Sequence, residues 1–395
     1  MSWRRWKRVL WCVGALLAAL ALVKSFVADV YLVETGSMRP TIFGGRERPD
    51  EPEDSEHVLV RYARGFRPER FDLVVMNARD DGPPIVKRVA GLPGEELAIR
   101  DGDLFVSGAR LPPGSPRPTL VCLFDSRWQD LQALFEFRRD GSVSPSGDEW
   151  IMRGAEPVEL GYHPRLTDGY LDRHHRPVPG LREVNDGALR LECRLEEPAA
   201  DVDLRLFLVE AGDSFEVELS TRTHALRLVR RVPRALAQSS ADPGEEIELA
   251  RVPVELPPGR WFDLAFSNVD DQLLLRSSAL GLHVRSGYAG NRPCPAGTDV
   301  ESGSVGTRVG FEISGGVVRV RSVRVLRDLY YTEAGTYGTT APIRLGPDEY
   351  FLLGDNSAAS TDSRHFGPVR AHELIGIPVA VVAPRPRWLE PVGEP

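Results

Sequence analysis

The chain has 395 residues, of which 27% are charged, and its formal net charge is -8 at pH 7. This length exceeds the usual span of one domain and predicts two folded units. The acidic balance argues against nucleic acid as the main partner, because a protein surface that binds nucleic acid is usually basic. The 32 prolines and 37 glycines, among many valines and leucines, predict short strands separated by turns and therefore a mainly β protein.

The first 28 residues predict a membrane anchor. Residues 1–8 carry four basic side chains, and residues 9–23 follow as an apolar run without a charge. Lys24 can extend its side chain to the membrane surface, and residues 25–28 lengthen the run to about 20, enough for a helix to cross a bilayer core. Basic residues before the run favour a cytoplasmic N-terminus at 1–8, a transmembrane helix at 9–28 and an extracytoplasmic remainder. A cleavable signal peptide has the same outline and is the alternative.

Short runs rich in β-branched residues predict strands on both sides of a long central segment. Such runs occur at 58–62, 71–77, 85–90 and 96–100, and again at 349–353 and 377–383. We therefore expect residues 29–110 and 344–395 to form one β domain. Residues 111–343 show alternating amphipathic runs joined by turns, without a helical period. They predict an inserted β-sandwich domain with a core of its own.

The four cysteines leave the redox state open. Cys12 lies in the apolar run, whereas Cys122, Cys193 and Cys294 are widely spaced and show no metal-ligand pattern. One disulfide with one free thiol fits this spacing, and so do three buried thiols. We expect neither a metal site nor a cofactor.

A serine in a glycine-containing turn follows the predicted anchor. It is Ser37, in the segment Thr35-Gly36-Ser37-Met38-Arg39-Pro40-Thr41. A serine in a polar loop is ordinarily a turn or capping residue. The segment therefore needs a partner base before it indicates catalysis.

A lysine in the middle of an apolar strand is the second signal. Lys87 lies in Ile85-Val86-Lys87-Arg88-Val89-Ala90, which leads into the turn Gly91-Leu92-Pro93-Gly94. If Lys87 points inward, burial disfavours its ammonium form and lowers its pKa from about 10.4 by up to about 3 to 5 pH units, so that a neutral amine can deprotonate a serine. The alternation of a strand equally allows Lys87 to point outward and Arg88 inward, or both to lie on an edge.

A polar loop after an apolar strand is the third signal. The run Phe351-Leu352-Leu353 leads into Gly354-Asp355-Asn356, followed by Ser360-Thr361-Asp362-Ser363-Arg364-His365. Together the three segments resemble the conserved boxes of type I signal peptidases, peptidase family S26, in order and in spacing within each box. Residues 71–75 also resemble a strand of that family, although Phe71 replaces the more usual glycine. The resemblance covers roughly residues 9–105 and 345–385 and implies a signal-peptidase-type β catalytic domain with an apolar surface near the membrane.

The resemblance also implies roles for individual residues. Ser37 would attack the scissile carbonyl, and Lys87 would take its proton and later deliver one to the leaving amine. The Ser37 backbone N–H and the Thr35 hydroxyl would stabilise the oxyanion. Ser360 would orient the Lys87 amine. The residues expected to support this arrangement are Arg88, Asp355, Asn356, Asp362 and Arg364.

The resulting prediction is a signal peptidase I, a single-pass serine endopeptidase of a bacterial-type plasma membrane. Its expected partners are the lipid bilayer and exported precursor proteins with signal peptides. Cleavage is expected after small residues at the first and third positions before the cut. This specificity comes from the resemblance alone.

Two other functions compete with this prediction. The first alternative is a Ser/His/Asp hydrolase that uses Ser37, His365 and Asp362. Against it, the position of His365 is commonly aromatic in the family. Residues 260–270 resemble a strand of laminin-G or concanavalin-like sandwiches, so a catalytically inactive, membrane-tethered lectin-like binding protein is the second alternative. Ser37 and Lys87 both lie in intact boxes, which favours the enzyme. Whether the insert binds a glycan or a protein stays open.

Overall fold

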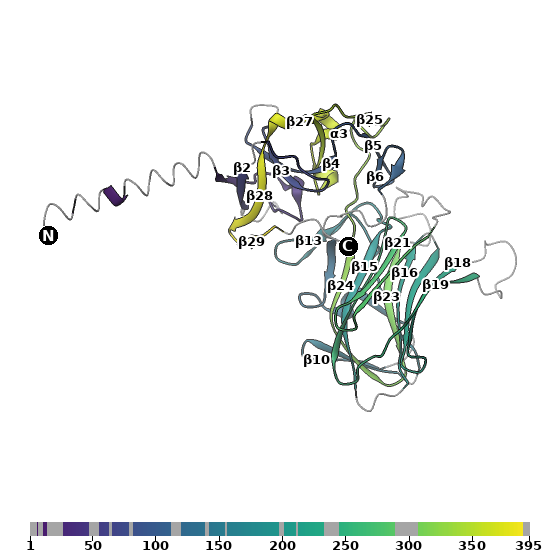
Figure 1. The fold of residues 1–395 in the computed structure, drawn as a ribbon. Coiled ribbons are helices and arrows are strands. Elements are labelled where there is room, and N and C mark those ends of the chain that lie inside the picture. Colours follow the sequence, from purple (N-terminus) through teal and green to yellow (C-terminus); the bar gives the residue numbers. More distant parts are fainter. Residues whose placement is uncertain are drawn as a thin grey trace. The chain divides into compact units, whose positions relative to one another are not determined.

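The computed structural model describes residues 6, 11–13, 27–46, 55–62, 65–78, 82–111, 120–138, 142–154, 156–196, 201–210, 212–232, 245–288 and 307–389. In this part of the chain the structure is mainly β, with short helical turns (Figure 1). The chain divides into two compact units, unit 1 from Met1–Arg110 and Tyr331–Gly393, and unit 2 from Leu111–Tyr330.

Unit 1 is built around one antiparallel sheet. In spatial order its strands are β1 (Ala28–Leu32), β2 (His57–Tyr62), β28 (Leu374–Ala383), β3 (Leu73–Met76), β4 (Ile85–Gly91), β26 (Glu349–Leu353) and β27 (Val369–Arg370), with β29 (Arg387–Trp388) beside β28. A smaller sheet contains β25 (Ile343–Arg344), β5 (Glu96–Arg100), β6 (Asp103–Val106) and β7 (Ala109–Arg110). β28 lies between β2 and β3, and β26 pairs with β4, so both ends of the sequence form one body.

Two apolar clusters stabilise the main sheet. Successive side chains of a strand point to opposite faces, so β3 contributes Val75 to one cluster and Val74 to the other. Met38, in the turn after the predicted anchor, packs in the Val75 cluster and is 1% exposed. This packing holds the Ser37 turn against the sheet.

The return from the insert to unit 1 lies earlier than the sequence pattern suggests. Residues 331–343, which the pattern assigns to the insert, belong to unit 1. The Tyr331 backbone N–H donates to Gly102 O at 2.9 Å, and those of Thr336 and Tyr337 donate to Arg364 O at 2.7 and 3.0 Å. This segment has no alternating pattern, and its place is determined by hydrogen bonds to residues far away in the sequence.

Unit 2 contains two large packed antiparallel sheets and a two-stranded sheet of β13 (Tyr170–Leu171) and β14 (Pro177–Val178). The first contains, in order, β10 (Ser142–Ser146), β11 (Glu149–Arg153), β24 (Val317–Arg327), β15 (Gly187–Leu195), β20 (Trp261–Val269), β21 (Gln272–Ser277) and β22 (Leu282–Gly287), with β8 (Val121–Asp125) beside β24. The second contains β19 (Glu245–Pro253), β18 (Ala225–Val232), β17 (Asp213–Ser220), β16 (Asp203–Glu210), β23 (Arg308–Ser314), β12 (Val158–Tyr162) and β9 (Phe135–Arg138). One buried cluster joins Phe266 of the first sheet to Phe215 of the second. The insert therefore has its own core; its laminin-G or concanavalin-like character stays a prediction.

Two of the cysteines considered for a disulfide carry free thiols. These are Cys122, which is partly exposed, and Cys193, which is buried in β15. Burial raises the pKa of the Cys122 thiol to about 11, so this thiol stays protonated at neutral pH. Cys294 lies outside the described residues.

Most of the predicted anchor lies outside the described residues, which include 11–13 and 27–28 of the 9–28 span. Within the described ranges, no helix combines the length and the apolar character that a bilayer crossing requires. The transmembrane assignment therefore stays a prediction from the sequence.

Leu275 and Leu181 form a matched pair for testing the core of unit 2. Leu275 is 0% exposed and Leu181 is 83% exposed. We expect Leu275→Ala to lower the free energy of unfolding of unit 2 by about 2 to 5 kcal/mol, because it leaves a cavity. Leu181→Ala should change it by less than about 0.5 kcal/mol. Urea unfolding of both variants measures the difference, and equal values would contradict a core at β21.

Candidate active site

Ser37 lies in a short 3-10 turn, η1 (Gly36–Met38), that follows β1. The far end of the chain holds this turn in place. The Asn356 side chain donates from Nδ2 to Gly36 O at 3.0 Å, and its backbone N–H donates to Ser37 O at 3.0 Å. Asn356, which was predicted as a supporting residue, thus binds the carbonyl oxygens of both Gly36 and Ser37.

The Lys87 side chain reaches from the middle of β4 to this turn. Its Nζ lies 2.7 Å from Ser37 Oγ and 3.2 Å from Ser360 Oγ. The Thr35 hydroxyl lies 3.2 Å from Ser37 Oγ, on the side of the turn that precedes the serine. Four residues predicted to share one site, from three separate segments of the sequence, therefore meet around one serine oxygen.

Both Lys87 and Arg88 are buried, although they are neighbours on one strand. Lys87 is 2% exposed and Arg88 is 6% exposed. From the sequence we expected one of the two side chains to point inward and the other outward, or both to lie on an edge strand. The structure differs because β4 lies between β3 and β26 and is covered on both faces, so alternation moves a side chain from one buried environment to another.

Burial sets the protonation of the lysine. It lowers the pKa of Lys87 from 10.5 to about 8, against the opposing effect of the Asp362 and Asp355 carboxylates, while the Arg364 guanidinium lowers it further. At pH 7 about one amine in ten is then neutral. Because that amine already contacts a serine hydroxyl, the pair can act as general base and nucleophile.

Arg88 and Asp355 form a buried ion pair behind the lysine. Arg88 donates from Nε to Asp355 Oδ1 at 2.7 Å and from Nη2 to Oδ2 at 2.6 Å, the bidentate geometry that a guanidinium and a carboxylate favour. The Thr41 hydroxyl also donates to Asp355 Oδ2. This pair joins β4 to the loop after β26 and to the end of the Ser37 segment.

The backbone conformation of Phe71 accounts for the glycine that is usual at this position in type I signal peptidases, the family that the sequence resembles. Its φ is +70°, in the left-handed region that side chains other than glycine rarely adopt. Arg88 Nη1 donates to Phe71 O at 2.8 Å, and the Phe71 N–H donates to Val89 O at 2.7 Å. Two hydrogen bonds and a buried ring thus hold a backbone conformation that costs on the order of 1 kcal/mol or more.

Asp362 and Arg364 form the second buried ion pair. Arg364 Nε lies 2.9 Å from Asp362 Oδ1 and Nη2 lies 2.7 Å from Oδ2. Asp362 Oδ2 also accepts from the Gly354 backbone N–H at 3.0 Å, so the pair ties both ends of the loop that carries Ser360. Removing one partner of such a pair leaves an uncompensated buried charge and typically costs about 3 to 5 kcal/mol.

Two residues of this network were not predicted. Thr332 O and Ser357 O accept from Arg364 at 2.9 and 2.8 Å. Ser357 lies inside the third motif, but no feature of the neighbouring sequence marks it as a supporting residue. Thr332 lies in the segment assigned to the insert, so no sequence signal pointed to it.

The Ser/His/Asp alternative lacks its central contact. Ser37 Oγ has Lys87 and Thr35 as neighbours, and His365 is not among its hydrogen-bond partners. His365 Nδ1 lies 3.9 Å from Asp362 Oδ1, and its side chain is 39% exposed. The base next to the serine is therefore the lysine.

A small cavity opens beside Ser37. Its volume is about 40 Å³, and its walls are mainly apolar. The lining residues include Leu32, Met38, Val75, Ile85 and Val86. A space of this size accepts a methyl group and excludes a large side chain.

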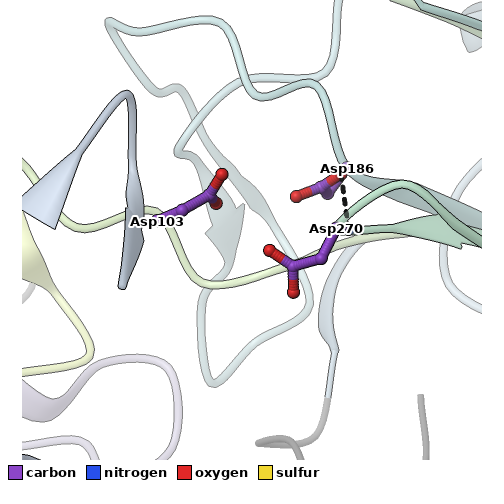
Figure 2. A group of neighbouring side chains, drawn as sticks. All are labelled: Asp103, Asp186 and Asp270. Atoms are coloured by element: carbon purple, nitrogen blue, oxygen red, sulfur yellow. Dashed lines mark hydrogen bonds between the residues drawn. The ribbon is translucent and has the colours of Figure 1, made fainter. Parts of the chain in front are cut away.

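Among the described residues, neither unit taken by itself contains a group of three side chains placed to hold a metal ion. In unit 2 the Asp270 backbone N–H donates to Asp186 Oδ1 at 3.2 Å, a bond between the turn after β20 and the turn before β15 (Figure 2). Asp103, also drawn in that figure, belongs to unit 1. The two carboxylates of unit 2 are fewer than the roughly 6 to 8 oxygen ligands of a calcium ion.

Comparison with known proteins gives the following similarities. The family model described as signal peptidase, peptidase S26, matches residues 5–130 and 324–383. Signal peptidase I P of Bacillus subtilis subsp. natto is 34% identical over 101 residues, 25% of this chain and 50% of the relative. Signal peptidase I of Bacillus caldolyticus is 31% identical over 125 residues, 31% of this chain and 60% of the relative. The chain thus spans about half the length of the curated relatives that it matches.

Among solved structures, the carbohydrate binding module CBM66 from Bacillus subtilis aligns with a TM-score of 0.31 and 6% identity, over 53% of this chain and 99% of that one. The Caenorhabditis elegans galectin LEC-6 aligns with a TM-score of 0.25 and 18% identity, over 46% and 99%. TM-scores at this level carry no conclusion about unit 2.

The pKa of Lys87 can be measured directly, because the sequence has three lysines, Lys7, Lys24 and Lys87. In protein with ¹³C-labelled lysine, we expect one ε-carbon resonance to titrate near pH 8 and to disappear in Lys87→Met.

The unfolded chain binds more protons than the folded one between pH 8 and 10.5, so the contribution of Lys87 to the free energy of unfolding rises with pH across that window. A Lys87 resonance that titrates near 10.5 would mean that the amine is hydrated.

Gly354 lies where no side chain fits. A Cβ at this position would lie 2.2 Å from Ser360 Oγ and 2.6 Å from Ser37 O. We expect Gly354→Ala to destabilise unit 1 by about 1 to 3 kcal/mol and to shift the Lys87 titration, because Ser360 must move. Gly287→Ala, with its nearest contact at 3.7 Å, is the control in thermal unfolding. Unchanged stability and titration in Gly354→Ala would show that the loop adjusts freely.

Proposed function

We propose that the chain is a membrane-bound signal peptidase I that cleaves precursor proteins through Ser37 and Lys87. The proposal is supported by the match of residues 5–130 and 324–383 to the family model described as signal peptidase, peptidase S26. The observation that carries the proposal is the 2.7 Å contact between Lys87 Nζ and Ser37 Oγ in a buried setting. Burial makes the amine a base near neutral pH, which a hydrated lysine is not.

In the proposed reaction, Ser37 Oγ attacks the carbonyl before the cut while Lys87 takes its proton. The Ser37 backbone N–H and the Thr35 hydroxyl stabilise the tetrahedral oxyanion. Lys87 then donates the proton to the leaving amine, and an acyl-enzyme remains on Ser37. Water activated by the same amine hydrolyses this ester and restores the serine. Ser360 keeps the amine directed at Ser37 throughout.

The pocket and the neighbouring sheet edge support a substrate with small side chains near the cut. The cavity beside Ser37 is about 40 Å³, a volume suited to alanine. β1 is the terminal strand of the main sheet, and its last residues line the same cavity. An extended precursor segment can pair with such an edge and place a small side chain in the cavity. The cavity is consistent with one small side chain near the cut, and the expectation of Ala-x-Ala sites still comes from the resemblance.

Exposed apolar residues of unit 1 support attachment to a membrane. Val30 and Leu32 of β1 are 46% and 42% exposed, and Trp388 of β29 is 78% exposed. Exposed apolar groups of this kind fit the bilayer interface, and β1 begins at Ala28, the last residue of the predicted anchor at 9–28. We therefore place the chain in a bacterial-type plasma membrane with residues 1–8 cytoplasmic and both units outside. A signal sequence held in the same bilayer is then confined near the site, which raises its effective concentration.

Cleavage of a precursor with an Ala-x-Ala site by the detergent-solubilised full chain tests the proposal. We expect Ser37→Ala and Lys87→Ala each to lower the cleavage rate by at least about 10³-fold. Ser360→Ala should lower kcat by about 10- to 100-fold, because a hydrogen bond to a charged group contributes about 1.5 to 3 kcal/mol. Ser278→Ala, an exposed serine of unit 2, is the control and should cleave like the wild type.

Circular dichroism of each variant separates loss of activity from loss of folding. A folded wild type that cleaves none of several precursors would overturn the peptidase proposal and favour the lectin-like binding protein. Cleavage that survives Lys87→Ala would retain a peptidase but reject lysine as its base.

A further inference from the structure

Unit 1 contains a second, larger cavity that shares no lining residue with the pocket beside Ser37. Its volume is about 730 Å³. It lies where the loop before β3, the turn after β4, and the starts of β26 and β28 meet. Small-molecule sites usually have volumes of about 300 to 1,000 Å³. The size is therefore that of a ligand site, and the dyad proposed above does not use it.

The walls of this cavity are largely apolar. Phe66, Val74, Leu92 and Leu374 line it together with prolines of three separate segments. Val74 and Tyr350 belong to the same buried cluster, so the floor of the cavity is part of the core of unit 1. A rigid apolar floor favours a ligand with an apolar body.

One polar group in this floor lacks a partner. Tyr350 is 3% exposed, and within the described ranges its hydroxyl has no hydrogen bond. The hydroxyl oxygen is not one of the buried atoms that lack a partner, so it is accessible from the cavity that Tyr350 lines. The Tyr350 hydroxyl is therefore a donor available to a molecule in the cavity.

A positive charge lies near that hydroxyl. Burial raises the pKa of Tyr350, and the nearby Arg67 guanidinium acts in the opposite direction. Arg67 also lines the cavity, is exposed, and has no ion-pair partner in the described part of the chain. A phenol donor and a guanidinium that lie close together form a site for an oxyanion.

Asp348 and His372 complete the polar lining and restrict the kind of anion. The Ala371 backbone N–H donates to Asp348 O at 2.8 Å, so these two side chains come from adjoining turns. The Asp348 carboxylate repels an anion in its neighbourhood and disfavours a doubly charged group more than a singly charged one. A monoanion at Arg67 and Tyr350, with an uncharged apolar body, matches this distribution of charge.

We propose that this cavity binds a small apolar carboxylate, whose oxygens accept from the Arg67 guanidinium and the Tyr350 hydroxyl while its apolar body contacts Phe66, Val74, Leu92 and Leu374. The site is separate from Ser37 and Lys87. The proposal does not depend on the peptidase activity, and its test measures binding alone.

The test uses 4-phenylbutyrate as the probe and the full chain, with saturation-transfer NMR as the readout. The neutral amide of the same shape, 4-phenylbutyramide, reports the contribution of the apolar body. We expect the carboxylate to bind at least about tenfold more tightly than the amide. Arg67→Met, which keeps an apolar stem, should remove this preference. Tyr350→Phe, which removes only the hydroxyl, should weaken carboxylate binding by about 2- to 12-fold.

Two further variants serve as controls. Arg344→Met removes an exposed arginine of unit 1 that does not line the cavity and should leave binding unchanged. Asp348→Asn should tighten carboxylate binding, because it removes the repelling charge. Equal affinity for acid and amide, an unchanged preference in Arg67→Met, or no saturable binding up to about 10 mM would each overturn the proposal.

Discussion

The burial of one lysine amine is the constraint on which the site depends. Lys87 lies in an interior strand, and the loss of its hydration brings its pKa down to about 8. The two aspartates near it, Asp362 and Asp355, act in the opposite direction and raise this pKa. Each is held by an arginine, Arg88 for Asp355 and Arg364 for Asp362. Each aspartate charge near the Lys87 amine is thus balanced by an arginine.

The same two pairs also determine geometry. One joins β4 to the loop after β26, and the other closes the loop that carries Ser360. Lys87 and Ser360 are thus held in place by groups whose hydrogen bonds do not involve the Ser37 side chain. Gly354 lies between these pairs, where the backbone approaches both Ser360 and Ser37. Ser37 therefore lies in a small and tightly packed neighbourhood, in which the buried charged side chains are held by hydrogen bonds.

The sequence predicted much of this arrangement and missed what depends on tertiary contacts. The strands expected at 58–62, 85–90, 96–100 and 349–353 lie within β2, β4, β5 and β26, because short β-branched runs between glycine and proline turns have few alternatives. Local pattern did not show that Lys87 and Arg88 are both buried, because a strand covered on two faces has no polar side. Thr332 was missed for a related reason, since its contact with Arg364 joins residues that nothing in the sequence connects. The membrane anchor remains a sequence prediction.

The pairing of β8 with β24 bears on how a domain so large can interrupt the sheet that holds the site. Val121 pairs with Arg327, so the chain enters and leaves unit 2 on neighbouring strands. For a flexible segment, the entropy lost on closing a loop grows with the logarithm of its length. Once unit 2 has folded, its ends are already adjacent, and the effective loop between β7 and Tyr331 shortens to 13 residues, 111–120 and 328–330. Early folding of the insert would then accelerate the distant pairing of β4 with β26, which otherwise makes folding slow.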